Sequence, residues 1–279
     1  MGREGRLEGI RTAWISGASS GLGAALAENL ARRGVEVILS ARRAELLEEV
    51  AARIRASGGS ARSLPLDVAD PEATVRALCR LDDEVGGLDL VIANAGVGNS
   101  RWAGRLRWED CADMIAVNVQ GAAASLVAVL PRMVERGRGH LVGISSLAGY
   151  RGMPASAAYS ATKAFLMTFL DSLRLDLQGT GVLVTDVRPG FIRTPMTAAN
   201  RFRMPFLMEV EEAAERIVEG IRKRKPIVAF PAPLSTAARL APAVPACLWD
   251  WMASRKGPAV DISFVRPRQV FDEPEAGEG

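Results

Sequence analysis

Ser16-Gly17-Ala18-Ser19-Ser20-Gly21-Leu22-Gly23 is the stretch that decides the fold. An apolar run over residues 12–16 precedes it and predicts a buried strand, and an amphipathic run over 22–33 follows it and predicts a helix. Glycines let the chain turn tightly and let a ligand approach the backbone, and the N-terminus of a helix attracts anions. The stretch therefore predicts a phosphate-binding turn between the first strand and the first helix.

The glycine spacing is GxxxGxG, which differs from the GxGxxG of the broader dinucleotide fingerprint. A glycine-rich turn that binds nothing is the alternative interpretation. Its position directly after the first strand favours a dinucleotide-binding turn. The residues that we assign to the cofactor are Gly17, Ser19, Ser20, Gly21, Leu22 and Gly23.

Outward from this turn, short apolar runs alternate with longer amphipathic runs, the pattern of a parallel sheet with helices on both faces. The predicted strands are 12–16, 35–40, 61–66, 88–93, 140–145, 182–187 and 227–230. The predicted helices are 22–33, 43–56, 71–85, 108–135, 157–178 and 210–223. They predict a doubly wound, Rossmann-type α/β sheet of seven strands in a single domain over 11–265, with ligands at the carboxyl ends of the strands. Residues 1–10 form an N-terminal extension, and 266–279 form a polar tail that we expect to be mobile.

Composition excludes several other classes of protein. The 279 residues are 48% apolar and 24% charged, with a formal charge of +3, which indicates a folded domain and no nucleic-acid partner. The three cysteines are far apart and lack metal-ligand spacing, so we expect free thiols in a reducing compartment and no metal. The first twelve residues lack a secretory apolar run, and no apolar run of about 18 residues occurs, which favours a cytoplasmic protein.

The end of the predicted second strand indicates which nicotinamide cofactor binds. NAD-binding folds usually place an acid there, whereas this chain has Ser40-Ala41-Arg42-Arg43. A guanidinium pairs well with a 2′-phosphate, so Arg42 is our first choice for that contact and Arg43 the second. A solvated helix start is the alternative. The sequence favours NADP(H) over NAD(H).

Two further segments end at the same predicted edge of the sheet. Asp67-Val68 follows the third strand and Asn94-Ala95-Gly96 the fourth. Each alone is an ordinary turn sequence. Their joint placement assigns all five residues to the cofactor site.

Tyr159 and Lys163 are four residues apart and therefore share a helix face. The pKa of a free phenol is about 10, and an adjacent ammonium is expected to lower it, which suits proton exchange near neutral pH. Ser146 ends the predicted fifth strand, where its hydroxyl could orient a substrate oxygen, although Ser145 beside it is the alternative. A surface Tyr and Lys on an amphipathic helix is the other interpretation.

Together these motifs resemble the short-chain dehydrogenase/reductase family over about 11–194, in its NADP-preferring type. The resemblance implies an oxidoreductase that moves a hydride between nicotinamide and a carbonyl or secondary alcohol. It implies that Tyr159 exchanges the proton and contacts the cofactor, and that Lys163 tunes Tyr159 and holds the nicotinamide ribose. It adds Asn118 as a fourth catalytic residue, holding a water that links the lysine to a proton relay.

The same resemblance implies further contacts and a quaternary structure. It places Asp67 near adenine and Asn94 in the central sheet, and it implies a homo-oligomer. Ser16 stands where threonine is commoner, a departure that keeps the hydroxyl. The residues that it places at the nicotinamide carboxamide are Pro189, Gly190, Ile192 and Thr194.

The chain after residue 194 is less constrained, because this region varies within the family. Residues 195–207 are predicted to form a lid over an apolar pocket, or else a core or oligomer segment. The lid interpretation implies a lipophilic substrate. Its apolar residues are Met196, Phe202, Met204, Phe206 and Leu207.

Residues 234–252, with Trp249 and Trp251 and followed by Arg255 and Lys256, could lie on a membrane surface. We favour packing against the fold or a partner subunit, because prolines interrupt a regular amphipathic helix there.

Two other functions compete with the enzymatic one. A serine hydrolase is disfavoured because residues 143–147 are not GxSxG and His140 is the only histidine. A non-enzymatic NADP(H)-binding sensor or scaffold of the same fold would typically lack part of the catalytic set, which is complete here.

Overall fold

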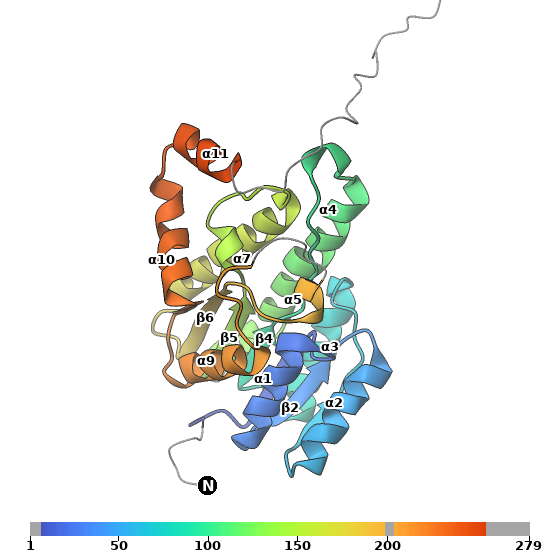
Figure 1. The fold of residues 1–279 in the computed structure, drawn as a ribbon. Helices are drawn as coiled ribbons and strands as arrows, with labels where there is room; N and C mark the ends of the chain where they lie inside the picture. The colour runs from blue at the N-terminus through green and yellow to red at the C-terminus, as the bar shows by residue number, and fades with distance from the viewer. Residues whose placement is uncertain (1–6, 199–203, 255–279) are drawn as a thin grey trace, which may run out of the picture.

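The computed structural model describes residues 7–198 and 204–254. Its seven strands form one sheet in the order β3-β2-β1-β4-β5-β6-β7, and every neighbouring pair is parallel (Figure 1). The strands are β1 Thr12–Ser16, β2 Glu36–Ser40, β3 Ala61–Ser63, β4 Leu90–Ala93, β5 Gly139–Ile144, β6 Val182–Pro189 and β7 Ile227–Phe230. The predicted seven-stranded, doubly wound single domain is confirmed.

β3 is shorter than the predicted strand over 61–66. The amides of Leu64 and Leu66 still donate to the carbonyls of Leu39 and Ala41 in and beyond β2. Pro65 lies between them, and because β3 is the edge strand, the N–H that Pro65 lacks would face away from β2. The chain therefore continues alongside β2 as far as Leu66, although the regular strand ends at Ser63.

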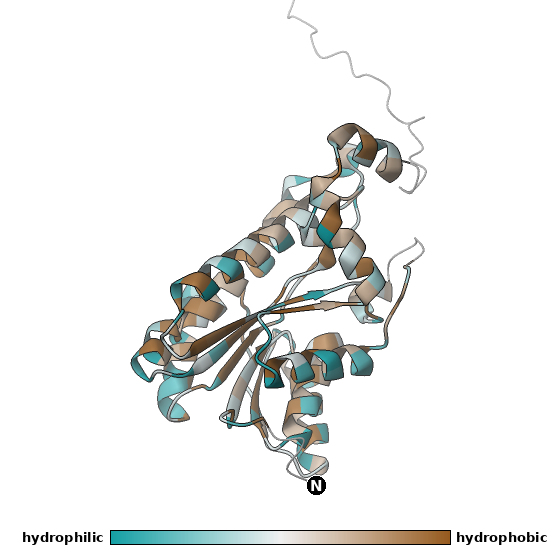
Figure 2. Ribbon diagram, turned by 90° about the vertical axis from the view of Figure 1, so that its left-hand side faces the viewer, coloured by the Kyte–Doolittle hydropathy of each residue, from teal (hydrophilic) through white to brown (hydrophobic). Residues whose placement is uncertain are grey.

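Helices cover both faces of the sheet, and Figure 2 shows mostly apolar strands between them. One buried core lies under α1, α2 and α9, and the second lies under α3, α5, α6 and α7. In β1, Ala13 and Ile15 belong to the first core and Trp14 to the second, as the two-residue period of a strand requires. The bounds are α1 Gly21–Arg32, α2 Ala44–Ala56, α3 Pro71–Glu84, α4 Trp108–Ile115, α5 Ala122–Val127, α6 Leu130–Glu135, α7 Ala157–Asp176, α8 Pro195–Ala198 and α9 Val210–Arg222.

The predicted single helix over 108–135 is instead α4, a π-helical turn Ala116–Gly121, α5 and α6. A Cβ on Gly121 would lie 2.5 Å from the carbonyl oxygen of Val68, so this glycine lets the π turn pack closely against the chain after β3. Pro131 lies in the first turn of α6, where its missing N–H costs nothing. Length and composition alone would let Trp108–Glu135 cross a membrane, but half of its most apolar window is buried, as in the core helix of a soluble protein.

Residues 234–252 form two helices, α10 Ala232–Leu240 and α11 Ala246–Ser254, joined through a 3-10 turn Ala241–Ala243. The prolines bound these helices and do not prevent them. Pro233 lies in the first turn of α10, Pro242 in the 3-10 turn, and Pro245 directly before α11. Arg255, Lys256 and the predicted tail over 266–279 lie outside the described residues.

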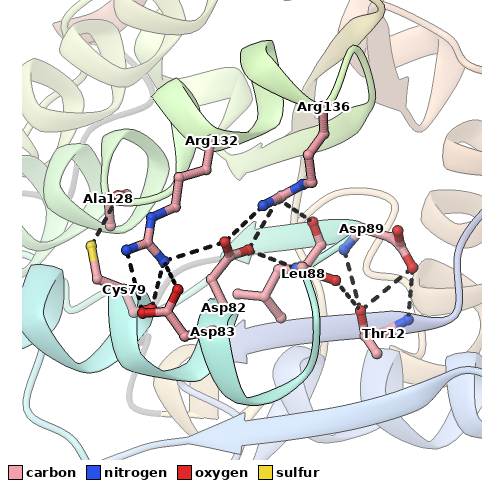
Figure 3. Close-up of polar contacts among 10 residues, drawn as sticks. Thr12, Cys79, Asp82, Asp83, Leu88, Asp89, Ala128, Arg132 and Arg136 are labelled. Atoms are coloured by element: carbon pink, nitrogen blue, oxygen red, sulfur yellow. Dashed lines mark hydrogen bonds and ion pairs between the residues drawn. The ribbon is translucent and has the colours of Figure 1, made fainter.

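A buried ion pair supports the base of the sheet, at the end opposite the strand carboxyl termini (Figure 3). Asp82 of α3 is 3% exposed, accepts two hydrogen bonds from Arg136 at 2.7 and 3.0 Å, and accepts one from the amide of Leu88. Burial alone would raise the pKa of Asp82, but the hydrogen bonds of Arg136 and Leu88 hold it below its ordinary value. This pair fixes the turn that leads into β4.

Candidate active site

A cleft of about 300 Å³ opens at the carboxyl ends of the central strands. Every residue that the sequence assigned to the cofactor lies on its wall, as do three of the four predicted catalytic residues. Asn118 lies behind the wall. Ser145 and three residues of the predicted lid, Pro195, Met196 and Thr197, also line the cleft. Sequence reasoning missed further lining residues, which carry no motif and reach the cleft only through the fold: Ala41, Leu66, Val97, Val117 and Ile144.

The glycine turn between β1 and α1 has room only for glycine at its two ends. A Cβ on Gly17, whose φ is +66°, would lie 2.8 Å from the Cα of Ala95. A Cβ on Gly23 would lie 2.4 Å from the carbonyl oxygen of Gly17. Gly17 and Gly23 thus let the turn fold tightly against the end of β4 and the start of α1, so that the amides that begin α1 border the cleft, and this cradle fits the pyrophosphate of a dinucleotide.

Asn94 and Ser16 lock the end of β4 to the end of β1. The Asn94 side-chain amide donates to the carbonyl of Ser16 at 2.9 Å, and the Ser16 hydroxyl accepts from the amides of Asn94 and Ala95 at 3.0 and 2.9 Å. The hydroxyl of Ser16, kept where threonine is commoner, therefore has a structural role. Asn94 holds the glycine turn in place beside the cleft.

The two arginines after β2 differ in the contacts that their side chains make. Arg43 Nη2 lies 3.3 Å from the hydroxyls of both Ser19 and Ser20, so its guanidinium spans from α2 to the glycine turn. Arg42 also lines the cleft, and both side chains are exposed. Arg43, our second choice for the contact with a 2′-phosphate, is thus the arginine that contacts the glycine turn.

Asp67 and Val68 follow the shortened β3 along the cleft. The Asp67 carboxylate accepts a hydrogen bond from the amide of Ala69 at 3.0 Å, which fixes a turn before α3. Asp67 is exposed, whereas Val68 is buried against the π turn. The two residues form the wall farthest from Tyr159 along the sheet, on the β2 and β3 side.

Tyr159, Lys163 and Ser146 converge at the other end of the cleft. Lys163 is 4% exposed, and its Nζ donates to the carbonyl of Ile144 at 2.8 Å and lies 5.7 Å from the centre of the Tyr159 ring. Ser146 lies two residues after β5 as the cap of a 3-10 turn, where its Oγ accepts from the amide of Ala148 at 3.1 Å. The same hydroxyl donates to the carbonyl of Pro189 at 3.5 Å, and its closeness to Tyr159 acts to lower the pKa of the phenol.

The structure corrects one electrostatic expectation. Burial raises the pKa of Tyr159 above its ordinary value, and the hydrogen bond from Ser146 opposes this only in part, so the expected lowering by Lys163 does not occur in this state. Burial also lowers the pKa of Lys163 to about 8, against the opposing charge of Asp186. The physical reason is that desolvation disfavours the charged form of both groups.

Ser145 and Ser146 are distinguished by their partners. The Ser145 hydroxyl is 2% exposed and donates to the carboxylate of Asp186 and the carbonyl of Val187. It is therefore committed to the protein interior. Ser146 is the serine whose hydroxyl can meet a ligand beside Tyr159.

Asn118 lies in the π turn and is 1% exposed. Its side chain exchanges two hydrogen bonds of 2.8 Å with the backbone of Val97 and donates to Thr162 at 3.1 Å. It therefore fixes the loop after β4 relative to α7. A Cβ on Gly96 would lie 3.4 Å from Asn118 Oδ1 and 3.5 Å from Lys163 Nζ, so both side chains flank the same backbone. The role of Asn118 in holding a water stays a prediction.

His140 lies at the start of β5, at the opposite end of that strand from Ser146. It is 3% exposed, its Nε2 lies 2.8 Å from the hydroxyl of Thr185, and burial lowers its pKa to about 4. A Ser-His-Asp mechanism is therefore excluded by distance along the strand. Within 7–198 and 204–254, no group of metal-ligating side chains occurs.

Residues before and at the start of the predicted lid line one side of the cleft. Pro189, Gly190, Ile192 and Thr194 line it, followed by Met196 of α8, which is 44% exposed. Beyond the gap in the described residues, Phe206 is 58% exposed. A backbone bridge between Ile192 and Met208 closes the two flanks into one loop. Phe202 lies outside the described residues.

Comparison with known proteins gives consistent matches. A family model described as short chain dehydrogenase matches residues 11–204. An uncharacterized oxidoreductase of Myxococcus xanthus (strain DK1622) is 52% identical over 245 residues, 88% of this chain and 97% of that protein. A short-chain dehydrogenase from Sphingobium yanoikuyae in complex with NADPH has a TM-score of 0.74 at 30% identity, over 94% of this chain and 99% of that chain. A short chain dehydrogenase/reductase from Burkholderia phymatum in complex with NAD has a TM-score of 0.77 at 22% identity, over 90% and 97%, a likeness of fold alone.

Proposed function

Because the chain belongs to the short-chain dehydrogenase family, we propose that it is an NADP(H)-dependent oxidoreductase that transfers a hydride between the nicotinamide and a carbonyl or secondary alcohol. One observation carries this proposal. A single cleft holds the glycine turn at one end and Ser146, Tyr159 and Lys163 at the other, so a dinucleotide held by the turn would bring its reactive end toward the phenol. The complete catalytic set argues against a sensor or scaffold.

The preference for NADP(H) is supported by charge. Two arginines and no acid follow β2, and Arg43 already reaches the hydroxyls of Ser19 and Ser20. A guanidinium attracts a 2′-phosphate, whereas an acid there would repel it. The family does not decide the question, since one similar structure holds NADPH and another holds NAD. We propose that Arg43 and Arg42 hold the phosphate together.

When bound, the nicotinamide donates or accepts the hydride. In carbonyl reduction, Tyr159 gives its phenolic proton to the substrate oxygen, and in alcohol oxidation it takes that proton back. The Ser146 hydroxyl, which lines the cleft beside the phenol, orients the same oxygen and stabilises the negative charge that develops on it. The ammonium of Lys163 holds the nicotinamide ribose.

A lipophilic substrate is supported by apolar residues that line the cleft. Val97, Pro195 and Met196 line the cleft, and Phe206 is exposed on the other flank of the lid. Apolar side chains at an entrance favour ring or long-chain carbonyls over small polar ones. Faster reduction of small sugars than of lipophilic ketones would contradict this.

A homo-oligomer is supported by apolar side chains that remain exposed on the long helices. Phe165 and Leu175 of α7 are 38% and 55% exposed, and Trp108 of α4 is 72% exposed. Exposed apolar groups of this size favour association. Light scattering during size-exclusion chromatography would measure the stoichiometry, and a monomer at micromolar concentration would contradict a homo-oligomer.

We also propose a cytoplasmic location.

The test of the whole proposal is NADPH oxidation against a panel of ketones, aldehydes, steroids and acyl derivatives. We expect turnover that depends on Tyr159 and is faster with NADPH than with NADH. Tight NADPH binding without turnover of any panel member would instead support the sensor.

A further inference from the structure

A buried charged pair on β6 lies directly behind the catalytic end of the cleft. Asp186 and Arg188 are 3% and 8% exposed, and Arg188 Nε donates to the Asp186 carboxylate at 2.6 Å. Arg188 Nη1 also donates to the Tyr150 hydroxyl at 2.7 Å, and its guanidinium lies 5.0 Å from the centre of that ring. Asp186 accepts a further hydrogen bond from the hydroxyl of Ser145. The four residues form one continuous network, in which Ser145, Asp186 and Arg188 are buried and Tyr150 is half-buried.

Three members of the network are joined to segments that carry site residues. Ser145 immediately precedes Ser146, and Arg188 immediately precedes Pro189 on the cleft wall. Tyr150 follows the 3-10 turn that Ser146 caps. The network therefore ties the ends of β5 and β6 to the loop beyond them, and it does so from inside the protein.

Burying two charges is an energetically unfavourable way to hold two strands together. Desolvating a carboxylate and a guanidinium costs several kcal/mol for each ion, and apolar residues of similar volume often pack at least as well. Holding the strands together therefore does not account for a charged pair. The charge of Asp186 lies close to a second charged group. The buried ammonium of Lys163 donates to the carbonyl of Ile144, and the next residue, Ser145, donates its hydroxyl to Asp186, so carboxylate and ammonium flank the same end of β5.

Resting on the proposed function, we propose that Asp186 is a positioning residue of the reaction, which keeps Lys163 cationic through space and holds Ser146 in line with Tyr159. Arg188 and Tyr150 fix the carboxylate in place. The direct partner of Lys163 Nζ is a neutral carbonyl, that of Ile144. Asp186 therefore supplies the negative charge that offsets the burial of the ammonium.

The charge of Asp186 acts on Lys163 in the direction that the proposal requires, because it favours the protonated ammonium. Burial lowers the pKa of Lys163, and the charge of Asp186 raises it, so the two effects leave it at about 8. The other titratable groups that face this pair are Tyr159 and Asp171 on α7, besides Arg188 and Tyr150. Removing the carboxylate is expected to lower the pKa of Lys163 further, so that less of it is protonated at neutral pH.

The sequence offers a direct measurement, because the chain has only four lysines. Protein labelled with [ε-13C]lysine should give four resolvable signals, and Lys163→Arg identifies the one from Lys163. In Asp186→Asn, the Lys163 signal should titrate about one pH unit lower than in the parent. Tyr150→Phe removes a hydrogen bond of the same network and no charge, so it is the matched control and should leave the titration unchanged.

Activity supplies a second reading of the same variants. In Asp186→Asn, the alkaline limb of the pH profile of kcat should move to lower pH by the same amount as the Lys163 titration. The KM for NADPH should change little. The inference is overturned if folded Asp186→Asn titrates as the parent does, or if Tyr150→Phe shifts Lys163 equally. If Asp186→Asn does not fold, the double variant Asp186→Asn/Arg188→Gln removes both charges and should still lower the titration of Lys163.

The outcomes for the two proposals are separable. Parent protein that turns over no substrate of the panel defeats the proposed function, yet the NMR titration still decides whether Asp186 controls the charge on Lys163. An active parent whose Lys163 titration ignores Asp186 defeats this inference alone.

Discussion

Arg43→Ala tests the most specific claim about the cofactor. Arg43 Nη2 lies 3.3 Å from the hydroxyls of Ser19 and Ser20, so its guanidinium is held where a 2′-phosphate beside the glycine turn would lie. A hydrogen bond to a charged group contributes about 1.5 to 3 kcal/mol. Because Arg43 is exposed, solvent screening reduces this, and we take about 1.5 to 2 kcal/mol. That corresponds to roughly a ten- to thirtyfold rise in the KM for NADPH.

The assay compares initial rates with NADPH and NADH in the parent, Arg43→Ala and Arg42→Ala. The NADH parameters are the internal control, because NADH lacks the phosphate and should be nearly unaffected. Arg42→Ala is the variant for comparison, since Arg42 shares the cleft and the exposure but not the contact with Ser19 and Ser20. We expect a smaller effect there. The loss in Arg43→Ala should also shrink at high ionic strength.

Two results would refute this reasoning. A parent without any preference for NADPH would show that the arginines do not select the cofactor. A full loss of preference in Arg42→Ala, with Arg43→Ala unchanged, would show that the contact with Ser19 and Ser20 is only structural.

Three further predictions concern other parts of the molecule. Tyr159→Phe should keep NADPH binding by fluorescence titration but lose nearly all turnover, and substantial residual turnover would refute its acid/base role. Gly23→Ala should weaken NADPH binding at least tenfold, because the new Cβ would lie 2.4 Å from a backbone oxygen, whereas Gly152→Ala has nothing within 4 Å and should bind normally. Arg136→Met should lower the free energy of unfolding by about 3 kcal/mol at pH 7, measured by urea denaturation. The pKa of Asp82 is lowered in the fold, so this stability is present above its unfolded pKa of about 3.9 and lost as the pH falls through the folded value. The difference between parent and Arg136→Met should therefore shrink in acid, and a constant difference would contradict the role of the pair.

Much of the fold follows from the sequence because its signals are local. Strands buried on both faces produce short apolar runs, and the helices that cover the two cores produce amphipathic ones. The seven strands could therefore be located to within a few residues. Interruptions in those elements were less visible. The π turn after α4 depends on the contact of Gly121 with Val68, which lies more than fifty residues earlier in the chain.

The candidate site divides in the same way. The glycine turn and the four-residue spacing of Tyr159 and Lys163 are local patterns, and residue types and spacing suffice to infer their chemistry. The network of Asp186 and Arg188 could not be inferred in this way, because a strand with charged residues carries no pattern that assigns their partners.

The sequence by itself determined which atoms are available for binding and chemistry, since residue types and local spacing set strands, helices and turns. Only the tertiary structure decided which of two adjacent serines serves the cleft. Asp186, forty-one residues away, takes the hydroxyl of Ser145 and leaves Ser146 beside the phenol. It also decided that the pKa of Tyr159 is raised and that of Lys163 lowered from their ordinary values. Both outcomes depend on burial and on charges brought from distant parts of the chain, and desolvation acts only once the chain has folded around these groups.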